Sequence, residues 1–168
     1  MKHFWKINTF FFFFFLSACK EKKTDPPPII ISSFSFEGKI ILIKDGDTYK
    51  ITSNGKEKTI RLEHIDCPEK KQPYGDKAKQ FAYDLCFGKT VVIRSSGKTD
   101  RNNRLIGEVI LPDETNLNQE FVKQGLAWHF KRYSTDTVYA RLEINAREKA
   151  IGLWSETNPI APWLWRKM

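Results

Sequence analysis

The chain has 168 residues, a formal net charge of +8, and an apolar and aromatic content that fits a globular protein. This length provides one domain with a real core and excludes two full-sized domains. The positive charge indicates an anionic partner, such as nucleic acid or a membrane surface, and does not bear on the fold.

The N-terminus has the layout of an export signal. Lys2 and Lys6 precede an unbroken phenylalanine run, Phe10–Phe15, and Leu16-Ser17-Ala18-Cys19 follows. The apolar run is far shorter than the ~20 residues that a membrane-spanning helix needs. We therefore interpret residues 1–18 as a signal peptide. The Leu-Ser-Ala-Cys segment resembles the bacterial lipobox, whose cysteine is diacylated; the alternative is an ordinary signal peptide with a chance cysteine.

These features predict an exported lipoprotein, anchored through Cys19 to the membrane of a bacterial cell envelope or surface. Residues 19–33 are charged and then proline-rich, which is typical of a spacer, and residues 34–168 form the domain. An exported compartment permits a disulfide between Cys67 and Cys86, but we favour two free thiols.

Downstream, the hydrophobic pattern changes from strand to helix and back. Strands are predicted over 36–43, 48–52, 58–65, 90–95 and 105–111, and helices over 74–87, 116–125 and 137–151. Five strands with a helix after the third are typical of an OB-type barrel, a mostly β member of the α+β class with about three helices. The tail, 158–168, is interpreted as an arm that packs on the domain through its tryptophans.

Two of these segments carry detailed predictions. Alternation over 58–65 places Arg61, Glu63 and Ile65 on one strand face, opposite His64. The last helix is expected to carry its apolar side chains at Tyr139, Leu142, Ile144 and Ala146.

Two carboxylates are expected to converge. Asp47 lies at the start of the second strand and Asp66 at the end of the third, and these points share one end of an antiparallel meander. A hard cation such as Ca²⁺ or Mg²⁺ would hold two such carboxylates together, because its ligands are oxygens. The cluster has no Cys/His spacing of the zinc type.

Arg61 and Arg104 add two guanidinium groups, whose planar fork matches phosphate oxygens. Glu69, three residues beyond Asp66, is then free to orient or deprotonate a water molecule. Each feature alone has an ordinary explanation, as a turn, a helix cap or a surface ion pair. Together they indicate a phosphodiesterase site with one metal ion.

Several motifs of the sequence resemble those of a known family. Asp45-Gly46-Asp47-Thr48, Arg61-Leu62-x-x-Ile65-Asp66-x-Pro68-Glu69 and Thr99-Asp100-x-x-x-Arg104 match the staphylococcal nuclease family in order and spacing. Tyr74-Gly75, Val122-x-x-Gly125-Leu126-Ala127 and Gly152-Leu153-Trp154 extend the match over roughly Phe36 to Trp154.

The resemblance implies an OB-type Greek-key barrel and a Ca²⁺-dependent nuclease with one ion per site, other hard divalent ions being possible. Single- or double-stranded DNA and RNA would be the substrates, and the products would carry 3′-phosphate ends. By position, Asp47, Asp66 and the backbone carbonyl of Cys67 match the metal ligands. Glu69 matches the proposed general base. Arg61 and Arg104 match the phosphate-binding pair.

The sequence also departs from the family pattern. The loop between Glu69 and Tyr74 is short, and Asn102-Asn103 replaces a Tyr-Gly pair before Arg104. Contacts with substrate are expected from Arg101, and from an aromatic platform at Trp128, Phe130 or Tyr133. We expect a monomer. The alternative function is a non-catalytic OB-type module that binds nucleic acid at the membrane.

Overall fold

The structure is a computed structural model that describes Met1 and residues 33–168. The predicted signal peptide, the candidate lipidation site Cys19 and nearly all of the spacer lie outside the described residues. Among the helices that are described, none has the length and apolar character that crossing a membrane requires.

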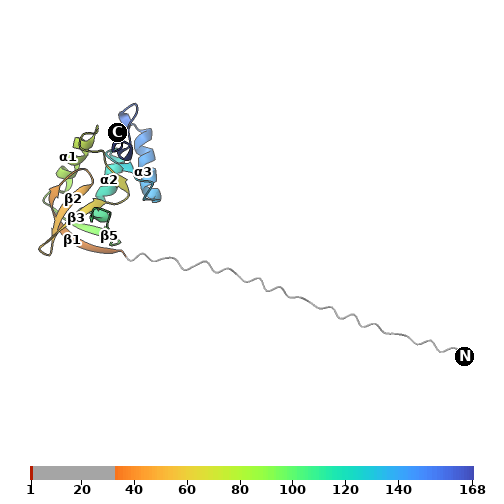
Figure 1. The fold of residues 1–168 in the computed structure, drawn as a ribbon, viewed down its shortest axis with the longest axis horizontal. Coiled ribbons are helices and arrows are strands. Elements are labelled where there is room, and N and C mark those ends of the chain that lie inside the picture. Colours follow the sequence, from red (N-terminus) through yellow and green to blue (C-terminus); the bar gives the residue numbers. More distant parts are fainter. Residues whose placement is uncertain (2–32) are drawn as a thin grey trace. The chain divides into compact units, whose positions relative to one another are not determined.

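A closed five-stranded barrel forms the centre of the domain (Figure 1). Its strands, in the order in which they neighbour one another, are β1 (Phe34–Ile43), β2 (Thr48–Ser53), β3 (Lys56–Leu62), β6 (Leu105–Ile110) and β5 (Thr90–Ser95). The pairing of β3 with β6 is parallel, and the other pairings are antiparallel. The predicted OB-type barrel is therefore confirmed.

The helices lie at one end and one side of the barrel (Figure 1). They are α1 (Gly75–Cys86), α2 (Leu117–Lys123), α3 (Thr137–Glu148), the 3₁₀ helix η1 (Gly152–Ser155) and α4 (Pro162–Trp165). Asn116 and Asp136 cap α2 and α3, each accepting a hydrogen bond from a backbone N–H of the first turn.

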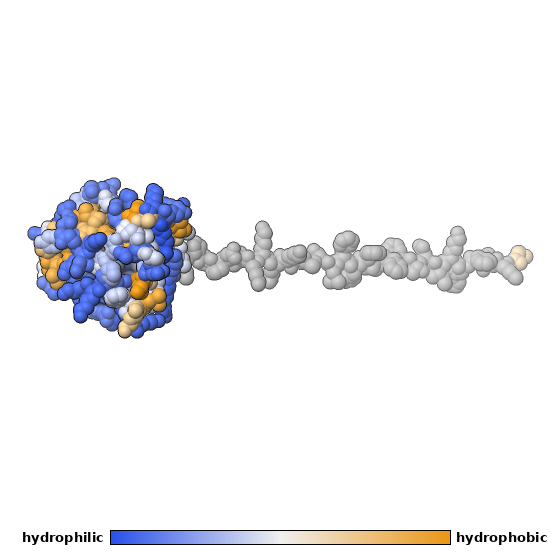
Figure 2. Space-filling view, turned by 90° about the horizontal axis from the view of Figure 1, so that it is seen from above, coloured by the Kyte–Doolittle hydropathy of each residue, from blue (hydrophilic) through white to orange (hydrophobic). Residues whose placement is uncertain are grey.

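One hydrophobic core joins the barrel interior to the helices. Alternate residues of the strands point inward, and Ile40, Ile51, Ile60 and Ile93 are completely buried. Small residues of α1 and larger ones of α2 cover them, including Ala78, Ala82 and Phe121. The face seen in Figure 2 is largely hydrophilic, with separate apolar areas. Cys67 and Cys86 are buried free thiols, as favoured from the sequence.

Two local predictions were wrong. β3 ends at Leu62, because His64 adopts a left-handed backbone with φ 68°, and the next strand, β4 (Ile65–Asp66), pairs with β7 (Trp128–His129) instead. The strand alternation therefore stops before Ile65. On α3, Ile144 is 51% exposed while Glu143 is buried, because positions 139, 143 and 146 share the inner face.

The C-terminal arm packs through its aromatic residues, as predicted. Trp163 stacks on Phe130 at a centroid distance of 5.3 Å and meets the edge of Trp128 at 5.5 Å. Trp128 also meets Trp154, at 4.5 Å. A hydrogen bond of 2.6 Å from Gln72 Nε2 to the Ile160 carbonyl fixes the start of the arm.

Candidate active site

The first acidic turn is held by a hydrogen bond from its backbone to the Asp45 side chain. Asp47 N–H donates to Asp45 Oδ1 at 3.1 Å, which closes the turn before β2. Gly46 is required by space, because a Cβ there would lie 2.8 Å from Cys67 Cβ and 2.9 Å from Ala78 Cβ. The turn is thereby pressed against the chain that follows β4 and against α1.

This packing brings Asp47 to the second acidic segment. Leu62 N–H donates to the Asp47 carbonyl at 2.8 Å, and Cys67 N–H donates to Asp47 Oδ2 at 2.9 Å. The β2–β3 register pairs Thr48 with Arg61. The convergence of Asp47 and Asp66 that the meander predicted is therefore present.

Arg61 lies between the two carboxylates. Its Nη2 is 2.8 Å from Asp66 Oδ1 and 3.2 Å from Asp47 Oδ2, and its side chain is 12% exposed. Its Nη1 donates to the carbonyls of Leu62 and Ile65, at 2.7 and 2.9 Å. The main chain thus fixes one arm of the guanidinium, and the other arm contacts both carboxylates.

Negative charge dominates this buried centre. Burial, together with the neighbouring charge of Asp47, raises the pKa of Asp45 to about 6. Burial also raises the pKa of Asp66, although Arg166 and Arg61 act to lower it. Burial lowers the pKa of Arg61, but the negative charges of Asp47 and Asp66 raise it by more. The pKa of Arg61 is therefore raised overall.

The raised pKa of Asp45 predicts a pH-dependent stability. A carboxyl whose pKa rises from 3.8 to about 6 on folding stabilises the native state fully below pH 3.8, and that contribution is lost as the pH rises through 6. We expect Asp45→Asn, which keeps the Oδ1 acceptor, to stabilise metal-free protein at pH 7 by roughly 1–3 kcal/mol. Urea unfolding of both proteins should show the gain shrinking toward pH 4; an equal gain at both pH values would contradict the assignment.

Glu69 lies in the turn that leads into α1. Its carbonyl and amide groups both pair with Gln72, through Gln72 N–H at 2.8 Å and Gln72 Oε1 at 3.1 Å. Gly75 permits this tight turn, because a Cβ there would lie only 2.0 Å from the Glu69 carbonyl oxygen. The Glu69 side chain is 40% exposed and receives a hydrogen bond of 2.6 Å from Arg166 Nη1.

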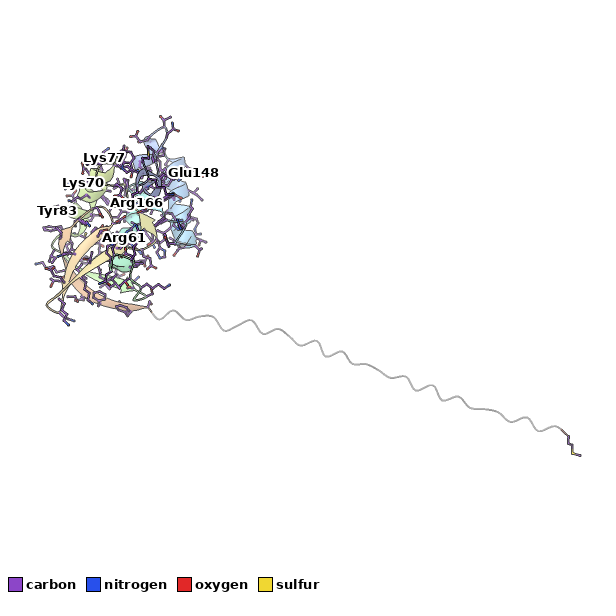
Figure 3. All side chains as sticks on the ribbon, viewed as in Figure 1. Arg61, Lys70, Lys77, Tyr83, Glu148 and Arg166 are labelled. Atoms are coloured by element: carbon purple, nitrogen blue, oxygen red, sulfur yellow. The ribbon has the colours of Figure 1, made fainter. Side chains whose placement is uncertain are left out.

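Arg166 follows α4 in the C-terminal arm and contacts a second carboxylate as well. Its Nη2 lies 2.7 Å from Asp66 Oδ2, and its Nη1 lies 3.3 Å from Asp66 Oδ1. Figure 3 shows Arg61 and Arg166 in the same central region of the domain, between the barrel and the helices. The sequence predictions did not include Arg166.

Arg104 borders the same centre from the loop before β6. Its Nη1 donates to Thr48 Oγ1 at 3.0 Å, and Thr48 Oγ1 in turn donates to Asp47 Oδ1 at 3.1 Å. Asp100 fixes the guanidinium, with Nε and Nη2 of Arg104 at 2.7 and 2.6 Å from Asp100 Oδ2. A groove of about 440 Å³ runs beside Arg104 and is also lined by Lys44 and Lys50.

The sequence matches a family model over part of this site, from Arg61 to Arg104. The model described as "Staphylococcal nuclease homologue" matches residues 59–156, more than half of the chain. The chain belongs to the staphylococcal nuclease family. It is therefore a nuclease, a hydrolase of phosphodiester bonds.

Relatives of this nuclease cover most of the domain. An "Uncharacterized endonuclease" of Escherichia coli is 41% identical over 129 residues, which are 77% of this chain and 84% of the relative. A protein of the same description from Haemophilus influenzae is 42% identical over 130 residues, covering 77% and 72%. A "Micrococcal nuclease" of Shigella flexneri is 35% identical over 142 residues, covering 79% and 81%.

The acidic centre of this nuclease suits a hard cation by its donor chemistry. Asp47 Oδ2 and Asp66 Oδ1 already contact one common atom, Arg61 Nη2, so a single small centre reaches both. The side-chain atoms there that can bind a metal ion are carboxylate oxygens, the ligands that Ca²⁺ and Mg²⁺ prefer. Within residues 33–168, no three or more His, Cys, Asp or Glu side chains form a metal-binding group. The described residues thus bring two carboxylates to this centre, and the Cys67 carbonyl is the third candidate ligand.

Three of the four candidate substrate contacts occupy different surroundings, and the fourth, Phe130, stacks on Trp163. Tyr133 is 72% exposed, and Arg101 is exposed in the turn before Arg104. Trp128 is the cross-strand partner of Asp66, but its ring packs against Trp154 and Trp163. The roles of Arg101, Trp128 and Tyr133 in substrate binding stay predictions.

Proposed function

We propose that this chain is a Ca²⁺-dependent endonuclease that cleaves DNA and RNA by attack of water on phosphorus and leaves 3′-phosphate ends. The observation that supports this proposal best is the convergence of Asp47 and Asp66 on one small centre, with Glu69 and Arg61 beside it. Family membership supplies the reaction class.

In this proposal Asp47, Asp66 and the carbonyl of Cys67 hold the cation. When bound, the ion neutralises charge on a phosphoryl oxygen and makes the phosphorus more electrophilic. Other hard divalent ions share the preference for oxygen ligands and are candidates for the same position.

The remaining steps belong to side chains of the chain itself. Glu69 accepts a proton from the attacking water as the new P–O bond forms. Arg61 and Arg104 bind the non-bridging oxygens and stabilise the added negative charge of the five-coordinate phosphorus. The bond from phosphorus to the 5′-oxygen then breaks, and the leaving 5′-oxygen takes a proton from solvent to become a hydroxyl. The phosphate stays on the 3′ side.

Two features support the approach of a polyanion. The net charge is +8 for the full chain and +6 (+8 − 2) without residues 1–18, which contain Lys2 and Lys6 and no acidic residue. This positive charge favours association with nucleic acid and makes it sensitive to salt. The groove beside Arg104 has Lys44 and Lys50 along its wall, so positive charge continues away from the acidic centre. Nη1 of Arg61 is bound to main-chain carbonyls, and Nη2 contacts Asp47 and Asp66. In this proposal the two carboxylates bind the cation instead, and Nη2 is the nitrogen that a phosphate oxygen would then contact.

Product analysis tests this function. Single-stranded DNA, double-stranded DNA and RNA labelled at the 5′ end should each give internal cleavage products with Ca²⁺. Phosphatase treatment should then shift their mobility, because it removes a 3′-phosphate. Products with 3′-hydroxyl ends would overturn the proposed direction of cleavage. DNA that is bound but intact would favour the alternative, a non-catalytic nucleic-acid-binding module.

We also propose that the nuclease is an exported, membrane-anchored lipoprotein that acts as a monomer at the bacterial cell envelope or surface. The export and the lipid anchor rest on the sequence of residues 1–19, in which Cys19 follows a short apolar run and three small or apolar residues. Metabolic labelling with a radioactive fatty acid should mark the protein but not its Cys19→Ala variant. Equal labelling of both would overturn the anchor.

A further inference from the structure

The side chain of Glu69 has a single hydrogen-bond partner among the described residues, and it comes from the far end of the chain. Arg166 Nη1 donates to Glu69 Oε1 at 2.6 Å, across 97 positions of sequence. The same guanidinium donates to both oxygens of Asp66, at 2.7 and 3.3 Å. Arg166 therefore joins the candidate base to the candidate metal ligand.

The arm that carries Arg166 is well anchored. Arg166 N–H donates to the Pro162 carbonyl at 3.0 Å, so the residue continues the turn of α4. Trp163, within α4, stacks on Phe130 with an interplanar angle of 11°. The packing of α4 therefore holds the Arg166 guanidinium at the acidic centre.

We propose that Arg166 is a positioning residue for the nuclease reaction: it holds the Glu69 carboxylate next to Asp66 so that the base faces the reacting phosphate. This inference rests on the proposed function, in which Glu69 is the base. Carboxylates three positions apart at one centre repel each other, and a shared guanidinium offsets that repulsion. Without Arg166, the half-exposed Glu69 side chain would turn toward solvent.

The kinetic test compares Arg166→Gln and Arg166→Lys with the wild-type full chain on single-stranded DNA. We expect Arg166→Gln to lower kcat by roughly 10- to 100-fold, the scale for a misplaced catalytic group, with a change in KM below about 3-fold. Arg166→Lys should recover part of kcat, because lysine keeps the charge but loses the fork. Lys167→Gln, the same change of charge one position later, should match wild type.

A double-mutant cycle separates positioning from a general structural effect. If Arg166 acts through Glu69, Arg166→Gln should have little further effect on kcat in a Glu69→Gln background. An equal fold-loss in both backgrounds would overturn the proposal. The melting temperature of Arg166→Gln is measured as well. If it falls so far that unfolding at the assay temperature accounts for the loss of kcat, the proposal is also overturned.

Calcium binding to chelator-treated protein, measured by titration calorimetry, provides a readout apart from activity. Arg166 occupies both oxygens of Asp66, so Arg166→Gln should bind Ca²⁺ at least as tightly as wild type while its kcat falls. A rise in kcat together with tighter Ca²⁺ binding would overturn positioning and identify Arg166 as an inhibitory contact. A wild-type protein that does not cleave DNA with Ca²⁺ would instead refute the proposed function.

Discussion

Replacing Glu69 with glutamine is expected to lower kcat by roughly 10²- to 10⁴-fold and to leave the affinity for single-stranded DNA nearly unchanged. Glutamine has almost the same shape and keeps an oxygen that accepts from Arg166 Nη1, now 2.6 Å from Glu69 Oε1. It cannot take a proton from water. Single-turnover cleavage and fluorescence anisotropy, on the same labelled oligonucleotide, measure the two quantities separately.

Glu148→Gln, a change of the same charge at the exposed end of α3, is the matched control and should cleave at the wild-type rate. Near-normal cleavage by Glu69→Gln would refute the assignment of the base. A large loss of DNA affinity in that variant would show that Glu69 acts in binding instead of in proton transfer.

Replacing Arg61 with lysine is expected to reduce kcat/KM by about 10²- to 10³-fold, the usual effect of removing one donor to a developing negative charge. Lysine keeps the positive charge, but it lacks the fork that contacts the carbonyls of Leu62 and Ile65 together with the carboxylates. These buried acceptors lose partners, so the free energy of unfolding should fall by about 1–3 kcal/mol. Initial-rate kinetics and urea unfolding measure the two effects.

Arg94→Lys makes the same chemical change at an exposed position on β5 and is the matched control. It should change neither kcat/KM nor the free energy of unfolding. Calcium should restore part of the stability of Arg61→Lys, because a cation at the acidic centre replaces the contacts that the guanidinium makes with Asp47 and Asp66. Wild-type activity in Arg61→Lys would contradict the role of the fork in holding the phosphate.

Much of the site followed from the sequence because its parts lie close to strand ends. Asp47 directly precedes β2, and β3 runs back beside that strand, so hairpin geometry alone brings Asp47 toward the Asp66 segment. The barrel followed in the same way, from alternating residues and turn signals. Strand alternation and turn residues are therefore enough to predict contacts between strands that are neighbours in sequence.

The rest depends on contacts that local patterns do not encode. The left-handed backbone of His64 separates β3 from β4, although the residues keep a strand-like alternation. Glu143 is buried on α3 because Lys131 and Arg147 neutralise it, at 2.6 and 3.1 Å. Arg166 reaches the site through the packing of an arm about 100 residues downstream of Asp66, and its neighbours in sequence give no sign of this.

The central claim is that Asp47 and Asp66 hold a cation on which cleavage depends. The most direct measurement is the rate of single-stranded DNA cleavage as a function of Ca²⁺ concentration, for wild type and Asp66→Asn. We predict a saturable dependence for wild type, no cleavage with a chelator, and a calcium requirement raised at least about 10-fold, or activity abolished, in Asp66→Asn. Cleavage that persists in the chelator, or the same calcium dependence in both proteins, would contradict the claim.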